Sequence, residues 1–389
     1  MKYDICVVTG TRADYGLLHE LLIRLKNNPE VLLDLVVTGS HLSDKFGNTQ
    51  DEIINDGFSN YTTLPIPMDD DTKEGMAKST GNAISIFTDY FSSNRPEILV
   101  VLGDRYEILA ASIAAHFLGI PIAHISGGDI TEGAIDNAIR HSITKMSSLH
   151  FPGCEQSKKR IIQMGEDPST VFNVGEPGVE NCLKTNFLSR EELAGSIGFT
   201  NVLKDYSVVT FHPVTLENSN GIQQIQELIK AMDAFPGMSY IITLANSDAG
   251  GREINDYWKA QEINHKNWLI VPSLGVKRYL SALKFSKLVL GNSSSGIVEA
   301  PALGIPTVNI GDRQKGRMIS GSVVCCNTVS ADIQKAITKV LSSDFQENAK
   351  HVISPFGDGS TSELIEKYLL SFLSDLPTKQ NIKKSFHDI

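Results

Sequence analysis

A short stretch rich in serine and glycine could bind a phosphate group. It runs from Gly291 to Gly296, follows an apolar run from Lys287 to Leu290, and precedes Glu299. Small residues let backbone N–H groups and hydroxyls approach an anion closely, and a helix that begins there adds the positive end of its dipole. The same residues also fit an ordinary Asn/Ser helix cap. The diphosphate interpretation therefore needs support from other parts of the chain.

Other predicted strands also end in polar residues. In an open parallel sheet, ligands bind beyond the carboxyl ends of the strands. Any single end could be a simple turn, because glycine and aspartate favour turns for backbone reasons. The residues at or just after the ends of predicted strands include Arg12, Asp14, His41, Asp104, Arg105, His124, Ser126, Asp129, His212, Asn246 and Arg313. Their recurrence predicts a ligand that has several oxygens and negative charge.

Apolar runs alternate with helical patterns, which is typical of parallel sheets with crossover helices. In the first half, strands are predicted over 3–9, 32–37, 97–102 and 120–125, and helices over 17–26 and 106–118. In the second half, strands are predicted over 207–211, 238–244, 268–271, 287–290 and 306–310, and helices over 222–232, 277–284 and 297–303. The pattern predicts an α/β protein with two Rossmann-like domains.

The domain limits are predicted at a polar stretch from Gly175 to Lys184, in which Glu176, Pro177 and Gly178 read as a breaker and hinge. We expect an N-terminal domain over 1–178 on the sugar side and a C-terminal domain over 179–360 on the nucleotide side. A C-terminal helix and tail, 361–389, are expected to pack back on the N-terminal domain. The polar tail from Lys379 onward is expected to be loose.

The composition excludes several classes of protein. The 389 residues have a formal net charge of −10, which argues against a nucleic-acid-binding surface. The five cysteines show no CxxC spacing, and an odd count fits thiols in a reducing compartment. No apolar run approaches the roughly 18 residues that a membrane span needs, and the chain opens directly into a predicted strand. We therefore expect a cytoplasmic protein without nucleic-acid or membrane partners.

The common nucleotide and metal signatures are missing. Gly10 to Gly16 lacks the G-x-G-x-x-G spacing, and no P-loop occurs near Gly291 or Gly311. His124, Asp129, Asp136 and His141 could be imagined as metal ligands, but their spacing matches no known metal motif. Neither a metal nor another cofactor is expected. Asp136 and Arg140, four residues apart on a predicted helix, could be no more than a surface ion pair, but their neighbourhood favours a functional role.

Several motifs, in order over nearly the whole chain, closely resemble those of the hydrolysing UDP-N-acetylglucosamine 2-epimerases. They are the segments 10–15, 39–42, 47–49, 103–105, 127–128, 139–141, 291–294 and 309–314. The resemblance implies a glycosyltransferase-B-like fold with the active site in the cleft between the domains. It also implies that UDP-N-acetylglucosamine and water yield UDP and N-acetylmannosamine through a glycal, for nonulosonic (sialic-type) acid synthesis. A homodimer or homotetramer is implied too.

The resemblance also implies roles for individual residues. Catalytic roles are implied for Asp104, Arg105, Asp129, Asp136, Arg140 and His212. Arg12, the Ser293 and Ser294 turn and His212 would serve the diphosphate, Glu299 the ribose, and Asn246 and Ser273 the uridine side. The complete set implied to bind substrate is Arg12, Asp14, His41, His124, Ser126, Asn246, Ser273, Asn292, Ser293, Ser294, Gly296, Glu299 and Arg313.

One position departs from the pattern of the family. Some members carry Glu where this chain has Ser126, and some carry Glu where it has Asp129. A hydroxyl cannot replace a carboxylate base near neutral pH, so proton transfer is assigned first to Asp104 and Asp136 and then to Asp129. The change could instead reflect a substrate modified at C4, such as a UDP-2,4-diacetamido-2,4,6-trideoxyhexose on the route to legionaminic acid.

Two further interpretations stay open. A non-hydrolysing epimerase would share the fold and chemistry but return UDP to the glycal. A glycosyltransferase-B-type transferase or a sugar-nucleotide binding module, which belong to other classes, would share only the architecture.

Overall fold

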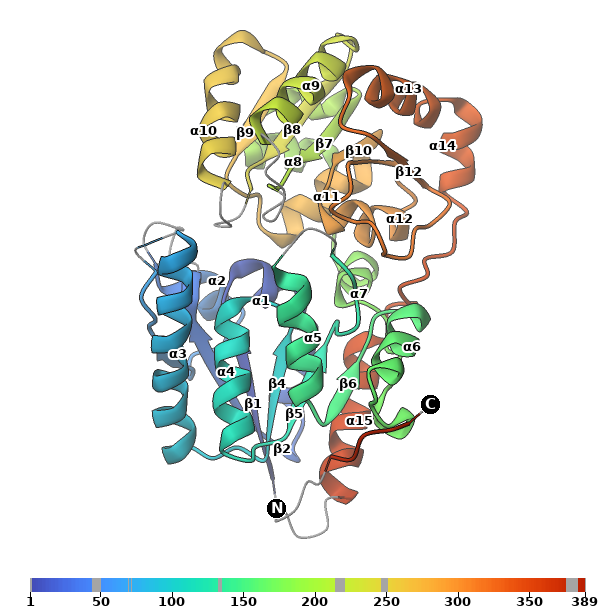
Figure 1. Ribbon diagram of the computed structural model, residues 1–389. Helices are drawn as coiled ribbons and strands as arrows, with labels where there is room; N and C mark the ends of the chain where they lie inside the picture. Colours follow the sequence, from blue (N-terminus) through green and yellow to red (C-terminus); the bar gives the residue numbers. More distant parts are fainter. Residues whose placement is uncertain are drawn as a thin grey trace. The chain divides into compact units, whose positions relative to one another are not determined.

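The structure is a computed structural model that describes residues 2–43, 50–68, 70, 72–131, 135–213, 221–245, 251–375 and 384–388. The chain divides into two compact units (Figure 1). Unit 1 comprises Met1–Asp129, Asp136–Glu180 and Phe356–Ile389, and unit 2 comprises Ile130–Ile135 and Asn181–Pro355.

The described part of unit 1 is built on a six-stranded parallel sheet in the order β3-β2-β1-β4-β5-β6. The strands are β1 Tyr3–Thr9, β2 Val31–Thr38, β3 Thr62–Leu64, β4 Ile98–Leu102, β5 Ile122–Ile125 and β6 Leu149–Phe151. The central strands are apolar on both faces, as expected for a parallel sheet covered by helices on both sides. Successive side chains alternate between two separate cores, Val7 in one and Cys6 in the other.

Helices cover both faces of this sheet. Figure 1 shows α3 (Lys73–Ser93), α4 (Tyr106–Phe117) and α5 (Asp136–Met146) side by side on one face. The core of the other face includes side chains from α1 (Arg12–Asn27), α2 (Gln50–Asn55) and α15 (Thr361–Asp375). The remaining elements are α6 Glu155–Gln163 and the 3-10 helices η1 Gly39–Leu42 and η3 Pro168–Thr170. The sheet is thus a Rossmann-like layer.

Unit 2 repeats the architecture. Its described residues form a six-stranded parallel sheet in the order β12-β11-β10-β7-β8-β9. The strands are β7 Tyr206–Thr210, β8 Ser239–Thr243, β9 Trp268–Val271, β10 Leu288–Gly291, β11 Thr307–Ile310 and β12 Val323–Cys326. One core contains side chains of α9 Gly221–Asp233, α10 Gly251–Gln261, α13 Ser330–Val340 and α14 Ser343–Ala349. The second core contains side chains of α8 Arg190–Ile197, α11 Val276–Phe285 and α12 Glu299–Ala302. Short 3-10 helices are η4 Thr200–Leu203, η5 Glu262–Asn264 and η6 Ser294–Gly296.

The predicted fold class is confirmed, because each unit is a parallel α/β sheet. The helix predicted over 297–303 is wrong in its extent: the structure has η6 and then α12, a helix of four residues. Pro301 lies inside α12, and because proline has no N–H it cannot continue the hydrogen-bond ladder. The dipole of a long helix therefore does not support the Gly291 turn.

The predicted breaker at Glu176, Pro177 and Gly178 is partly wrong. Pro177 is the first residue of helix α7, Pro177–Lys184, where a proline is tolerated because the first N–H has no partner within the helix. The chain passes from unit 1 to unit 2 within α7, after Glu180. The domain limits at 178 and 360 stay predictions.

The predicted loose tail is wrong for residues 384–388. Lys384 donates hydrogen bonds to the carbonyls of Lys145 at 2.6 Å and Ser147 at 2.7 Å, at the end of α5. Phe386 packs so closely on Gly165 that a Cβ there would lie 2.2 Å from its ring. These contacts tie the end of the chain to unit 1.

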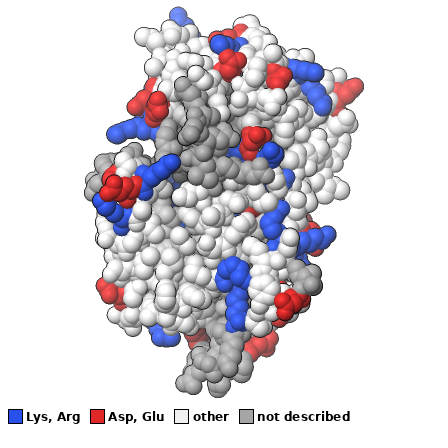
Figure 2. All heavy atoms as spheres, viewed as in Figure 1, with Lys and Arg blue, Asp and Glu red and all other residues white. Residues whose placement is uncertain are grey.

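The surface in view carries charges of both signs. Figure 2 shows Lys and Arg side chains interspersed with Asp and Glu, separated by wide uncharged areas. Within the described residues, no helix is both long and apolar enough to cross a membrane.

Candidate active site

The junction between β1 and α1 brings three backbone segments close together. A Cβ on Gly10 would lie 2.7 Å from Glu107 Cγ, and one on Gly39 would lie 2.7 Å from the Gly10 carbonyl oxygen. Gly39 also has a positive φ of 60°, which favours glycine. Thr11 then caps α1 by accepting a 3.2 Å hydrogen bond from the Asp14 backbone N–H. The two glycines therefore make room for the buried Glu107 beneath the strand end.

Asp14, predicted to bind substrate, lies in this junction and is 9% exposed. Burial raises the pKa of its carboxyl to about 7, while the nearby Arg105 lowers it and Glu107 raises it further. Its Oδ2 is buried and has no hydrogen-bond partner among the described residues. Asp14 is therefore a carboxyl group that titrates near neutral pH at the carboxyl edge of the sheet.

The raised pKa of Asp14 predicts a pH-dependent effect of Asp14→Asn on stability. The folded state binds this proton more tightly than the unfolded state, whose Asp pKa is about 3.9, so stability falls as pH rises between the two values. Asparagine avoids burying a charge. The variant should therefore gain melting temperature relative to the wild type from about pH 4 to pH 7 and keep that gain above pH 7. Thermal unfolding at pH 4, 6 and 8 measures this, and a pH-independent difference would contradict it.

Asp104 and Arg140 form an ion pair at the ends of β4 and β5. Gly103, with a φ of 78°, turns the chain after β4, and Arg140 Nη2 contacts Asp104 Oδ2. The Arg140 side chain is 5% exposed and that of Asp104 is 21% exposed. Arg140 Nη1 also donates a 2.9 Å hydrogen bond to the Asp129 carbonyl oxygen. The interpretation of Arg140 as part of a surface ion pair is therefore wrong, since α5 points this guanidinium into the protein.

Two other arginines are fixed by carboxylates. Arg105 Nε lies 2.6 Å from Oε1 of the fully buried Glu107, and the arginine side chain is partly exposed. Arg12 lies in the first turn of α1, and its Nη1 lies 3.6 Å from Glu52 Oε1. Both guanidinium groups stay at the carboxyl edge of the sheet, where they could meet an anionic ligand.

The histidines predicted to bind substrate in unit 1 lie in its interior. Burial lowers the pKa of His41 to about 4 and that of His124 to about 3, so both rings are neutral at pH 7. His124 Nε2 lies 2.8 Å from the Gly103 carbonyl oxygen and Nδ1 lies 3.1 Å from Thr144 Oγ1. These contacts hold the turn that precedes Asp104, so His124 supports the site from beneath.

The end of β5 gathers further polar groups. Ser126 is partly exposed, and its hydroxyl donates a 2.7 Å hydrogen bond to Glu176 Oε2. Asp129 is buried and accepts a 2.5 Å hydrogen bond from the Ser157 hydroxyl. Asp136, the first residue of α5, is partly exposed. Arg140 thus links two of the three residues predicted to transfer protons, Asp104 and Asp129, and Asp136 lies one turn earlier on the same helix.

In unit 2, the Gly291 turn depends on a close approach to β7. Gly291 has a φ of 127°, and a Cβ there would lie 1.9 Å from the Thr210 carbonyl oxygen. Asn292 accepts a 2.7 Å hydrogen bond from the His212 backbone N–H and donates one of 2.8 Å to the His212 carbonyl. Arg313 Nη1 donates a 3.1 Å hydrogen bond to the Asn292 carbonyl oxygen. The structure thus joins the ends of β7, β10 and β11.

The serines of this turn differ in their contacts. The Ser293 hydroxyl accepts a hydrogen bond from the Ser295 backbone N–H, as in an ordinary cap, and Ser294 is exposed. The Ser295 hydroxyl accepts a 2.8 Å hydrogen bond from Tyr279. Burial raises the pKa of Glu299, which begins α12. The exposed hydroxyl and the nearby arginine are suited to an anion, and Glu299 to ribose hydroxyls.

The remaining predicted residues of unit 2 lie in turns. Gly296 faces β11, where a Cβ would lie 2.8 Å from Thr307 Cγ2. Ser273 is partly exposed, and its hydroxyl accepts a 3.2 Å hydrogen bond from the Gly275 N–H ahead of α11. Asn246 lies outside the described residues.

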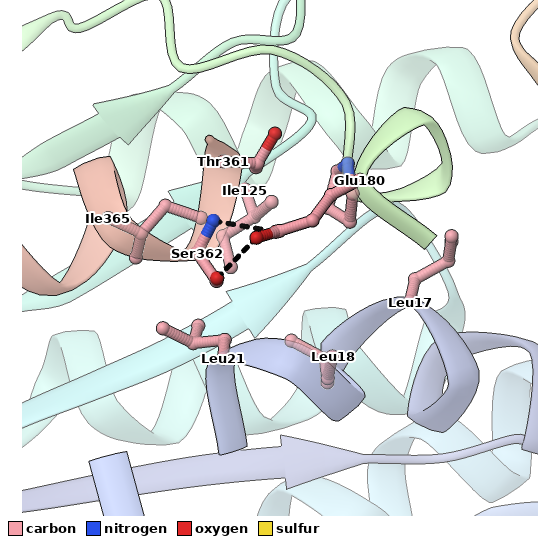
Figure 3. A pocket seen from close by; sticks show the side chains of 9 residues that line it. Leu17, Leu18, Leu21, Ile125, Glu180, Thr361, Ser362 and Ile365 are labelled. Carbon is pink, nitrogen blue, oxygen red and sulfur yellow. Dashed lines mark hydrogen bonds between the residues drawn. The ribbon is translucent and has the colours of Figure 1, made fainter. Parts of the chain in front are cut away.

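A small crevice in unit 1 is lined by residues that include Ile125 and Pro177, the chain neighbours of Ser126 and Glu176. Figure 3 shows apolar side chains from α1, β5 and α15 around Glu180, whose carboxylate accepts hydrogen bonds from the Ser362 N–H at 2.7 Å and hydroxyl at 2.5 Å. The crevice has no enclosed space for even a water molecule, whereas small-molecule sites have volumes of roughly 300–1,000 Å³. Glu180 therefore caps the start of α15 and does not mark a substrate site.

Sequence reasoning missed four polar residues that support the site: Glu107, Ser157, Glu176 and Tyr279. Glu107 could have been noticed because it lies two residues after Arg105. Glu176 was read only as part of a breaker, and its partner Ser126 is 50 positions away. Within the described residues, no group of three or more His, Cys, Asp or Glu side chains could hold a metal ion.

Comparisons with known proteins find close relatives. The profile of the UDP-N-acetylglucosamine 2-epimerase family matches residues 23–370. The chain is 39% identical over 349 residues to the GDP/UDP-N,N'-diacetylbacillosamine 2-epimerase (hydrolyzing) of Campylobacter jejuni, covering 89% of this chain and 90% of the relative. It is 37% identical over 363 residues to the UDP-N,N'-diacetylbacillosamine 2-epimerase (hydrolyzing) of Legionella pneumophila, covering 93% of this chain and 94% of the relative.

Two further comparisons extend this picture. The chain is 40% identical over 325 residues to polysialic acid biosynthesis protein P7 of Escherichia coli, covering 82% of this chain and 81% of the relative. The crystal structure of UDP-GlcNAc 2-epimerase from Neisseria meningitidis bound to UDP-GlcNAc has a TM-score of 0.80 at 20% identity, covering 95% and 100% of the two chains. This likeness shows the shared fold.

Proposed function

Because the chain belongs to the UDP-N-acetylglucosamine 2-epimerase family and is an enzyme of the hydrolysing UDP-sugar 2-epimerase kind, we propose that its substrate is a UDP-2,4-diacetamido-2,4,6-trideoxyhexose. The products are UDP and the free sugar with inverted C2, a precursor for nonulosonic acid synthesis. The observation that supports this substrate is the similarity over 90% and 94% of two relatives named for N,N'-diacetylbacillosamine.

The chemistry requires two proton transfers at C2. A proton leaves C2 as UDP departs and a glycal forms, and a second proton reaches C2 from the opposite face when water adds at C1. Two different groups must therefore serve the two faces. We assign one of them to Asp104, which is partly exposed and held by Arg140. Asp136 and Asp129 are the carboxylates predicted for the other.

The departing UDP needs donors and cations that stabilise its growing negative charge. In unit 2 we assign this role to Ser294, Arg313 and the turn that begins at Gly291. We assign binding of the ribose hydroxyls to Glu299. In unit 1, Arg12 and Arg105 add positive charge at the ends of the strands.

An assembly of two or four chains stays a prediction.

A second candidate substrate is UDP-N-acetylglucosamine, which would give N-acetylmannosamine. It is favoured by the 40% identity to polysialic acid biosynthesis protein P7 and by the 32% identity, over 88% of both chains, to a UDP-N-acetylglucosamine 2-epimerase of Neisseria meningitidis. The two substrates differ at C4 and C6 and share the chemistry at C2.

The test is a time course of the pure protein with each of the two UDP-sugars, followed by proton NMR. We expect UDP and 2-epimerised free sugar in equal amounts, and a higher kcat/KM for the diacetamido substrate. A higher kcat/KM for UDP-N-acetylglucosamine would replace the first substrate by the second. An epimerised product that retains UDP would indicate a non-hydrolysing epimerase, and UDP release only with an added acceptor would indicate a transferase.

A further inference from the structure

Ser126 and Glu176 form a hydroxyl–carboxylate pair at the carboxyl end of β5. The Ser126 hydroxyl donates a 2.7 Å hydrogen bond to Glu176 Oε2. Ser126 is partly exposed, whereas Glu176 is only 8% exposed. The carboxylate therefore lies behind a hydroxyl that a bound molecule can reach.

The backbone at Ser126 is strained. With a φ of 59°, Ser126 is the one residue other than glycine that has a positive φ within the described chain. Such a conformation is unfavourable for a residue with a side chain and persists where the surroundings impose it, often at active sites. Here the Ser126 N–H donates a 2.9 Å hydrogen bond to the Phe151 carbonyl at the end of β6, which helps to hold the turn. The backbone conformation sets where the Cβ of Ser126 points, and the hydrogen bond to Glu176 holds the hydroxyl.

The carboxylate is positioned as firmly as the hydroxyl. The Glu176 N–H donates a 2.8 Å hydrogen bond to the Phe356 carbonyl oxygen. A Cβ on Gly153 would lie 1.9 Å from Glu176 Oε1, so only glycine leaves room for the side chain. Burial is the main cause that raises the pKa of the Cys154 thiol, and the charges of Asp129 and Glu176 both add to it. Glu176 and Asp129 thus both lie close enough to Cys154 for their charges to act on its thiol.

We propose that Ser126 and Glu176 together remove the proton from C2 of the sugar, an inference that rests on the proposed 2-epimerase function. The C2–H bond breaks and its proton passes to Ser126 Oγ, while the Oγ–H proton passes to Glu176 Oε2. The electron pair of the C2–H bond forms the C1=C2 bond of the glycal. The C1–O bond breaks, and UDP leaves with its electron pair.

This pathway explains how a serine can stand at the base position. A hydroxyl alone is too weak a base near neutral pH, but it can pass a proton to a carboxylate behind it in the same step. The hydrogen bond already runs in the required direction, from Ser126 to Glu176. When water then adds to the glycal, Asp104 is left to deliver to the opposite face of C2 a proton that it has taken up from solvent, and the water gives its oxygen to C1 and releases a proton to solvent.

The first test is Glu176→Gln, which keeps a hydrogen-bond acceptor for Ser126 but cannot take up the proton. We expect kcat to fall by about 10²–10⁴-fold, as for loss of a general base. The primary isotope effect with substrate deuterated at C2 should become larger than in the wild type, because C–H cleavage becomes the slow step. Ser126→Ala should lower kcat and enlarge the isotope effect to a similar extent. The kcat of the double variant should be no lower than that of the poorer single variant, because the two residues act as a unit.

A matched control is Glu180→Gln. Glu180 also accepts a hydrogen bond from a serine hydroxyl, that of Ser362, but Ser362 is 1% exposed and the pair only caps α15. This variant should lower the melting temperature and leave kcat and the isotope effect unchanged.

Three results would overturn the proposal. The first is a Glu176→Gln variant that keeps kcat within about threefold of the wild type, far from the loss of a general base. The second is an equal loss in Glu180→Gln, which would indicate a structural effect of buried carboxylates in this region. The third is a wild-type protein that releases no UDP from either sugar, since the proposed function would then fall together with this pathway.

Discussion

Replacing Asp104 with asparagine is expected to lower kcat for the 2-epimerised sugar by about 10²–10⁴-fold, the usual contribution of a general acid or base. Asparagine can still accept a hydrogen bond from Arg140 but has no proton to deliver to C2. The glycal should therefore accumulate, and affinity for UDP should change little, because the groups assigned to UDP lie mainly in unit 2. Steady-state kinetics and mass spectrometry of the products measure this.

The control must separate chemistry from stability. Asp104→Asn also removes the charge opposite a guanidinium that is 5% exposed, so the melting temperature should fall. Asp104→Glu keeps the carboxylate and should recover part of kcat. Asp205→Asn removes a carboxylate that pairs with Lys287 at 3.6 Å on the surface and should have no effect on kcat. A kcat for Asp104→Asn equal to that of Asp205→Asn would remove Asp104 from the mechanism.

Replacing Gly291 with alanine is expected to destabilise unit 2 by about 2–6 kcal/mol, the combined cost of strain and overpacking. The new methyl group would lie 1.9 Å from the Thr210 carbonyl oxygen, and a φ of 127° is unfavourable for alanine. To remove this overlap, β10 would have to move away from β7. Because Asn292 follows directly and holds His212, UDP binding should be lost as well. Urea unfolding and calorimetric titration with UDP measure the two effects.

Gly195 provides the matched control for this variant. It lies in helix α8, and a Cβ there would meet no atom within 4 Å. Gly195→Ala should therefore stabilise by about 0.5–1 kcal/mol through the helix preference of alanine. If Gly291→Ala unfolded at the same urea concentration as Gly195→Ala, the close approach of β10 to β7 would be wrong.

The sequence allowed the central strands to be predicted closely, because their apolar runs are long and bounded by glycine and polar residues. β1 and β9 match the predicted ranges, and the other predicted strands differ by one or two residues at their ends. Three strands are missing from the prediction: β3 and β6 have only three residues each, one of those in β6 is His150, and β12 ends in two cysteines. The apolar pattern predicts one helix over 297–303, but Pro301 cannot donate the backbone hydrogen bond that a helix through this segment needs.

The candidate site could be predicted only where it follows local rules. Asp104 and Asp129 were found because they follow strand ends. The partner of Arg140 was not, because a spacing of four suggests Asp136 and says nothing of a strand end 36 positions away. Glu176 escaped for the same reason, since only the folded sheet brings it behind Ser126.

The most direct measurement is turnover of the UDP-2,4-diacetamido-2,4,6-trideoxyhexose in deuterated water with the wild-type protein. The account predicts UDP and an equal amount of free sugar with inverted C2 and one deuterium at that carbon. Free sugar that keeps its original C2 proton, or intact nucleotide sugar without deuterium, would contradict it.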